Sequence, residues 1–183
     1  MSDSREHEET RSGRHGVITT EGLLFPATKL QYHFAEPARR MLVRMAARGD
    51  DYLLVRSSDE EYETDVATLA SIVSYDEPSE ERTVVVLEGV GRVRVGETEQ
   101  RGEFTAAEWT WIEEAVEDER ACRSVAGDIL GVLQKLAEAD IEMAGQVAEQ
   151  AAEADSAAAV ADIVGSVTFD RLDEQRVPLE ETD

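Results

Sequence analysis

The chain of 183 residues is poor in several residue types, and each shortage excludes a class of protein. Its single cysteine, Cys122, cannot form an internal disulfide, and only two lysines are present, Lys29 and Lys135. Aromatic residues make up 5% of the sequence, which argues against a large stacking surface for bases or sugars. No apolar run approaches the roughly 20 residues that cross a bilayer, and the polar N-terminus lacks the apolar stretch of a secretory signal. We therefore expect a cytoplasmic protein without a membrane partner.

Basic residues are scarce relative to acids: 41 acidic residues stand against 18 Lys and Arg, which gives a formal net charge of −23. Such a surface repels a phosphate backbone, so we expect no nucleic-acid partner. Two interpretations of the excess acid remain. The acid either solvates the protein in the salt-rich cytoplasm of a halophile, where self-repulsion is screened, or it faces a basic partner. The first is favoured because the acids are spread over every segment.

The sequence also lacks the residue sets of the common catalytic and cofactor sites. No glycine-rich loop followed by Lys and Ser or Thr is present, so the chain has no P-loop for ATP. Lys29 falls on a predicted strand and Lys135 on an acidic helix, and neither is a credible partner for a serine nucleophile. The histidines His7, His15 and His33 lack metal-ligand spacing. We therefore expect no enzyme activity, no metal and no cofactor in this chain.

The first 50 residues are predicted to contain a tail, two short strands and a helix. Residues 1–16 show no periodicity and are predicted to be a disordered tail. The apolar run at 23–25 and the alternating pattern at 29–34 predict strands. Apolar residues at helical spacing then predict a helix that begins at Pro37, where a proline loses no hydrogen bond, and ends at Gly49.

The segment from 52 to 112 has a β pattern almost without interruption. It predicts strands at 52–55, 66–75, 83–87, around 93–95 and at 103–112, with a turn at 76–79. Gly89 and Gly91 predict a sharp change of direction between two of these strands. A break in the alternation of the last strand predicts a bulge near Ala107.

After residue 113 the strand pattern gives way to helical spacing. Residues 113–183 contain 19 acidic and 5 basic residues. Apolar positions predict helices at about 116–139, 141–154 and 157–167, and Asp170 is predicted to cap a last short helix. The chain is therefore divided into a tail at 1–16, a β domain at 17–113 and an acidic helical arm at 114–183.

Three motifs follow one another in the β domain. They are Phe25-Pro26 after the first apolar run, Glu36-Pro37 at the start of the helix, and Leu87-Glu88-Gly89-Val90-Gly91-Arg92-Val93-Arg94. Their order, together with the strands between them and the helices after them, resembles the amino-terminal substrate-binding domain of Lon proteases. The resemblance covers most of the chain.

The resemblance implies an α+β fold, in which a PUA-like, twisted and partly closed β-barrel with one crossing helix precedes the acidic helical arm. It also implies a non-catalytic module that recognises unfolded or degron-bearing polypeptides, with a protease or a chaperone as a further partner. Candidate contacts for such polypeptides are Leu23, Leu24, Phe25, Tyr32, Glu36, Pro37 and Arg39. The family motif is expected to be structural and comprises Phe25, Pro26, Glu36, Pro37, Leu87, Glu88, Gly89, Arg92 and Arg94.

Three alternatives remain open at this point. The chain is either a stand-alone recognition protein or the amino-terminal piece of a full ATP-dependent protease whose ATPase and peptidase domains are absent here. An RNA-binding role, which PUA-like barrels have elsewhere, is weaker because acids outnumber Arg92 and Arg94 around them. A hydrolase with an unrecognised site is opposed by the missing nucleophile–base set. For Leu24, Phe25 and Phe34, a place in the core competes with a role in binding.

Overall fold

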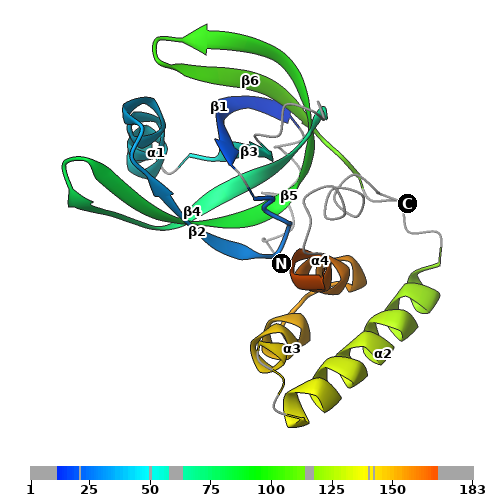
Figure 1. Ribbon diagram of the computed structural model, residues 1–183. Coiled ribbons are helices and arrows are strands. Elements are labelled where there is room, and N and C mark those ends of the chain that lie inside the picture. The colour runs from blue at the N-terminus through cyan, green and yellow to red at the C-terminus, as the bar shows by residue number, and fades with distance from the viewer. Residues whose placement is uncertain are drawn as a thin grey trace, which may run out of the picture. The chain divides into compact units, whose positions relative to one another are not determined.

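The computed structural model describes residues 12–20, 22–49, 51–57, 64–113, 118–139, 141 and 143–168. The chain divides into two compact units. Unit 1 comprises Met1–Leu24 with Lys29–Ile112, and unit 2 comprises Phe25–Thr28 with Glu113–Asp183. Strands and one helix make up the described part of unit 1, and helices dominate that of unit 2 (Figure 1).

Unit 1 is built on a single mixed sheet. Within the described residues its strands are β1 (Ser12–Thr20), β2 (Lys29–Phe34), β3 (Leu53–Ser57), β4 (Val66–Ser79), β5 (Arg82–Arg101) and β6 (Phe104–Trp111). The strand order is β2-β5-β4-β3-β1-β6, and β5 pairs in addition with β6. The sheet therefore curves back on itself as a partly closed ring, and β2 is attached to the ring through β5 (Figure 1). The predicted α+β fold with a partly closed sheet is confirmed.

A single helix crosses the sheet of unit 1 between two parallel strands. β1 and β3 pair in parallel, with Gly16 opposite Leu53. Parallel neighbours need a crossover connection, which here runs through β2 and the helix α1 (Pro37–Gly49). α1 has the bounds that the sequence predicts, and it buries Leu42, Val43 and Ala46 in the core of the unit.

β5 is one strand of 20 residues, and it corrects the prediction that Gly89 and Gly91 separate two strands. Consecutive residues of β4 lie opposite Gly91 and Gly89, so Val90 is the extra residue of a bulge. A glycine is required at position 91 because the ring of Trp111 lies against the backbone there and would clash with a Cβ. The hairpin turn between β4 and β5 lies at residues 80–81, so the turn predicted at 76–79 is also wrong.

The irregularity expected in the last strand lies on its neighbour instead. Trp109 is opposite Val95 and Ala107 is opposite Thr98, so three steps along β5 match two steps along β6. The extra residue therefore belongs to β5, at positions 96–97. β6 alternates regularly from Ala107 onward, and this places Trp109 on the inner face of the sheet.

Trp109 lies in a hydrophobic cluster of unit 1 and is 1% exposed. Its indole Nε1 donates a hydrogen bond of 2.7 Å to Nδ1 of His15, and the two rings stack with centroids 5.8 Å apart. His15 belongs to β1, which begins at Ser12, so the prediction of a tail through residue 16 is wrong for residues 12–16. The rest of the predicted tail lies outside the described residues.

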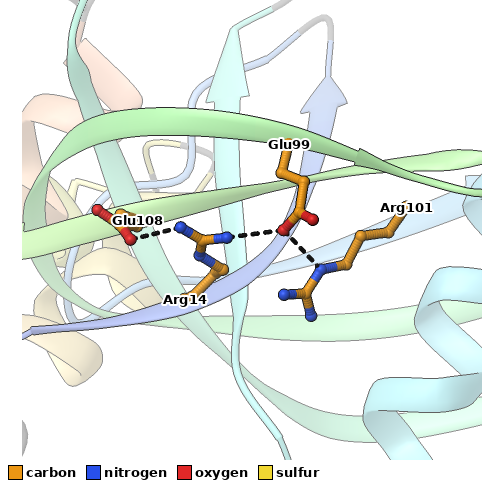
Figure 2. A network of polar contacts seen from close by, with 4 residues as sticks. All are labelled: Arg14, Glu99, Arg101 and Glu108. Atoms are coloured by element: carbon orange, nitrogen blue, oxygen red, sulfur yellow. Dashed lines mark hydrogen bonds and ion pairs between the residues drawn. The ribbon is translucent and has the colours of Figure 1, made fainter.

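Charged side chains link β1, β5 and β6 where the ring closes (Figure 2). Arg14 on β1 forms ion pairs with Glu99 on β5, at 2.7 Å, and with Glu108 on β6. Arg101 also contacts Glu99, at 3.1 Å. Hydrogen bonds from Arg101 and then from Arg14 hold the pKa of Glu99 below its usual range. Because all four side chains reach solvent, the network contributes little to stability and mainly fixes the relative positions of the strands.

Unit 2 contains the helices α2 (Glu119–Glu138), α3 (Ala144–Ala152) and α4 (Ala157–Thr168) among its described residues. Asp118 caps α2, because its Oδ1 accepts hydrogen bonds from the backbone N–H of Arg120 and Ala121 at 3.1 and 2.9 Å. The three helices share a core of small and aliphatic side chains: Ala126, Leu133, Val147, Ala151, Val160 and Ile163. They lie where the sequence predicts helices. The helix predicted after Asp170 lies outside the described residues.

Candidate functional site

The strand β2 pairs along only one of its edges among the described strands, and its other edge is called the free edge below. It pairs in antiparallel fashion with β5 over its full length, from Lys29 opposite Glu88 to Phe34 opposite Thr83. Among the described strands, none pairs with its other edge. An unpaired edge presents a row of backbone N–H and C=O groups, with which another extended chain can form a ladder of hydrogen bonds. This edge is therefore a place where unit 1 can accept an additional strand.

The side chains of β2 give this edge a mixed apolar and polar surface. Leu30 is 39% exposed. Gln31 and His33 are exposed on the other face of the strand. His33 lies 2.7 Å from Arg82 through Nδ1 and 2.9 Å from the amide of Gln31 through Nε2. These contacts link the polar face of β2 to the start of β5.

Tyr32 is oriented toward the core, and this corrects the expectation that it is an exposed contact. It is half-buried and packs against the main hydrophobic cluster of unit 1, with its ring stacked on Phe34 at a centroid distance of 6.0 Å. Burial raises the pKa of Tyr32 to about 12. Tyr32 therefore positions β2 by packing, and its replacement by Ala is expected to cost stability.

The start of α1 lies directly after β2 and is held by side-chain contacts. Pro37 is the first residue of the helix, and Glu36 precedes it. Arg39 forms an ion pair with Glu36 at 3.0 Å and donates a hydrogen bond of 3.3 Å to the hydroxyl of Thr19. The candidate residues thus lie together at one end of β2. The hydrogen bond from Arg39 to Thr19 links the start of α1 to β1.

Leu23, Leu24 and Phe25 are not on the surface. Their side chains are 7%, 1% and 0% exposed. Leu24 belongs to the main cluster of unit 1, whereas Phe25 belongs to unit 2. The strand predicted at 23–25 does not form, and an isolated bridge lies at Pro26. The structure therefore corrects the proposal that these three side chains offer an exposed apolar surface, and it assigns them to the interior.

The residues of the family motif in β5 have structural positions. Leu87 is fully buried in the main cluster, and Glu88 forms an ion pair with Lys29 at 3.3 Å, which links β5 to β2. Arg92 is buried, and Arg94 forms an ion pair with Asp65. Because Arg92 is enclosed and Arg94 is paired with an acid, these arginines give no support to a basic groove for RNA.

The described residues contain no group of three or more His, Cys, Asp or Glu side chains placed to hold a metal ion. None of the helices in this part of the chain is long and apolar enough to cross a membrane.

Sequence reasoning missed the free edge of β2. The alternation of Leu30, Tyr32 and Phe34 predicts the strand, but a strand's pattern says nothing about how many neighbours it has. The relevant signal is weak: Lys29, Gln31 and His33 make one face of the strand polar, as is common for edge strands.

Comparisons with known proteins agree with this architecture. The model of the ATP-dependent protease La (LON) substrate-binding domain matches residues 17–183. No curated protein matches the sequence. The N-terminal domain of Mycobacterium avium complex Lon protease superposes with a TM-score of 0.73 at 18% identity, covering 93% of this chain and 91% of that one. The Lon N-terminal domain protein from Xanthomonas campestris gives a TM-score of 0.69 at 18% identity, covering 93% and 92%. The chain belongs to the family of the Lon protease substrate-binding domain.

Proposed function

We propose that this chain binds unfolded polypeptides and that an extended segment of the client pairs with the free edge of β2. The observation that carries the proposal is the unpaired edge of a strand that is otherwise fully paired with β5. Pairing through the main chain accepts almost any client sequence, and side chains beside the edge add selectivity. An unfolded chain satisfies the geometry because its backbone is free to extend, whereas the strands of a folded client are already paired.

Apolar contact beside the edge supplies part of the binding free energy. Leu30 is exposed next to the free edge, and burial of apolar surface contributes about 25 cal/mol per Å² before ordering costs. Neither apolar burial nor backbone pairing depends strongly on ionic strength. The net charge of −23 adds attraction for basic clients only at low salt. We therefore expect modest affinity that persists at high salt.

The domain to which this chain is similar is non-catalytic, and the 183 residues contain neither an ATPase nor a peptidase domain. The proposed role is the same whether the chain acts alone or is joined to such domains. In both cases it holds a client, and the cleavage of peptide bonds falls to another polypeptide or another domain. A protease or a chaperone is accordingly the proposed downstream partner.

The proposal predicts a preference for unfolded clients. We would titrate the chain with a fluorescently labelled disulfide-bonded protein in two forms, one native and one reduced and alkylated. The unfolded form is expected to bind at least tenfold more tightly, at both 0.1 M and 1 M KCl, measured by fluorescence anisotropy. Equal affinity for the two forms would contradict the proposal, and loss of binding at 1 M KCl would favour a charge-driven basic partner.

Matched variants separate the β2 edge from other exposed apolar positions. Leu30 on β2 and Val90 on β5 are 39% and 42% exposed, so Leu30→Asp and Val90→Asp add the same charge at similar cost to folding. Leu30→Asp is expected to weaken client binding severalfold, whereas Val90→Asp leaves it unchanged. Thermal unfolding of both variants checks that the fold is retained.

A further inference from the structure

One face of α2 in unit 2 is apolar and exposed. Val125, Val132 and Leu136 are 56%, 55% and 40% exposed. They lie beside, but not within, the side that packs on α3 and α4 through Ala126 and Leu133. Apolar side chains thus extend around α2 beyond the part that the described residues of α3 and α4 cover. Large side chains arranged in this way on a helix surface usually mark a contact with another polypeptide.

The exposed face follows a coiled-coil spacing. Its positions are separated by alternating steps of three and four residues: Cys122, Val125, Ile129, Val132, Leu136 and Ala139. Ile129 is half-buried and joins this face to the internal core, and Ala139 is the residue that ends the helix. Such a seam is the pattern that allows two helices to pack side by side.

The seam is symmetric about its centre, between Leu130 and Gly131. When a second copy of α2 lies antiparallel about this point, Ile129 meets Val132 of the other copy, Val125 meets Leu136, and Cys122 meets Ala139. Each apolar residue therefore finds an apolar partner, and both helices contribute in the same way. This is the arrangement of a two-fold symmetric interface.

Charges flanking the seam are complementary in this arrangement. Asp128 and Lys135 are both exposed, and both lie on the flank of the seam that faces away from α3 and α4. In the antiparallel pair Asp128 of one copy lies within about 3 Å, measured along the helix axis, of Lys135 of the other, because the rise is 1.5 Å per residue. Within the described part of the chain neither side chain forms an ion pair. Lys135 is one of only two lysines in the protein, and it lies where it can neutralise the second copy's acid.

We propose that this chain self-associates through an antiparallel pairing of α2 with α2 of a second copy. The seam residues fit a second copy because they are symmetric about one point. The flanking charges fit it because, in each of the two contacts, one copy supplies the acid and the other supplies the base. A net charge of −23 on each copy opposes association, so the pairing strengthens as salt screens this repulsion.

The direction of the pairing is tested by disulfide cross-linking with diamide, which takes up the two electrons and two protons released when two thiols join. In the antiparallel pair the two Cys122 sulfurs are roughly 25 Å apart along the axis, so the wild-type chain is expected to give no disulfide dimer. Ala139→Cys places a second thiol opposite Cys122 of the other copy, and this variant is expected to form a covalent dimer in most molecules. Gln134→Cys, on the opposite side of α2, is the control and is expected to form no disulfide-linked dimer.

The strength of the pairing is tested by sedimentation equilibrium at 0.1 M and 1 M KCl. The wild-type chain is expected to dimerise more tightly at 1 M KCl. Val132→Glu is expected to abolish the dimer, whereas Gln134→Glu, which adds the same charge on the exposed opposite side, is expected to retain it. Lys135→Asp should weaken the dimer about tenfold, and the exchange Asp128→Lys with Lys135→Asp should restore it.

Two results would overturn the proposal. A wild-type chain that stays monomeric at all concentrations and salt levels would mean that α2 does not pair with itself, and loss of unfolded-client binding in Val132→Glu would then assign the seam to clients. Efficient cross-linking of wild-type chains through Cys122 would instead show a parallel pairing. Both results leave the proposed role of β2 open to its own test, since Val132 and Leu30 lie in different units.

Discussion

Replacing Trp109 by Ala is expected to lower the free energy of unfolding of the β unit by about 3–5 kcal/mol. The indole is 1% exposed and fills the centre of a cluster formed with Leu54, Ala67, Leu69, Val93 and Ala107. Loss of the indole leaves a cavity within this cluster. It also leaves Nδ1 of His15 without the donor that now lies 2.7 Å away.

Urea unfolding followed by tryptophan fluorescence measures this loss within unit 1; the signal comes from Trp111 in the Trp109 variants and from Trp109 in Trp111→Ala. Trp109→Phe is the matched variant: it keeps an aromatic ring in the cavity and removes the N–H, and we expect it to lose roughly half as much. Trp111→Ala, at a partly buried position, is expected to cost less than Trp109→Ala. Equal losses at positions 109 and 111 would contradict the packing described for β6.

The backbone nitrogens of an extended client peptide form two alternating sets, and each set can be methylated separately. Methylation of one set is expected to weaken binding about tenfold to a few hundredfold, and methylation of the other set is expected to leave binding unchanged. In an added strand every second N–H points to β2 and the others point to solvent. N-methylation of the first set removes the donors and introduces a clash, whereas methylation of the second set removes nothing that binds.

The comparison needs one unstructured peptide of about eight residues in three forms: unmodified and methylated in either set. Competition with a labelled client gives the three affinities. The two methylated peptides are matched in composition, hydrophobicity and chain stiffness, so a difference between them reports pairing of the backbone. Equal loss in both peptides, or no loss in either, would mean that the client is held through its side chains alone.

The elements that the sequence predicts well are those whose pattern depends on local contacts. The helix at Pro37–Gly49 has the predicted bounds because a proline at its start, a glycine at its end and regular apolar spacing all agree. The strand at Lys29–Phe34 alternates clearly, and the helices of unit 2 follow from their apolar spacing.

The sequence-based predictions are wrong where contacts between residues that are distant in the sequence determine the structure. Gly89 and Gly91 have the composition of a turn, but the partner strand and the ring of Trp111 keep the chain extended with a bulge at Val90. The segment at 12–16 forms a strand although its sequence has no apolar periodicity. The strand is stabilised by pairing with β6 and by the contact between His15 and Trp109. Neither contact is visible in a local window of the sequence.

The candidate site is predictable only in part. The motif at Glu36-Pro37 lies at the end of β2, where Arg39 contacts Glu36, and its role in binding stays a prediction. The sequence predicts apolar contacts because unfolded clients expose apolar groups. Burial is a property of the whole fold, however, and Leu24 and Phe25 are interior. The free edge depends on the strand order, which the sequence pattern does not determine.

Amide hydrogen exchange of β2 with and without an unfolded client tests the central claim most directly. In the free chain the amides of Lys29–Phe34 that point away from β5 have no partner strand among the described residues, and they are expected to exchange fast. The account predicts that a saturating client slows every second amide of β2 by at least tenfold, while the amides already paired with β5 change little. Unchanged exchange in β2, with protection appearing elsewhere in the chain, would contradict it.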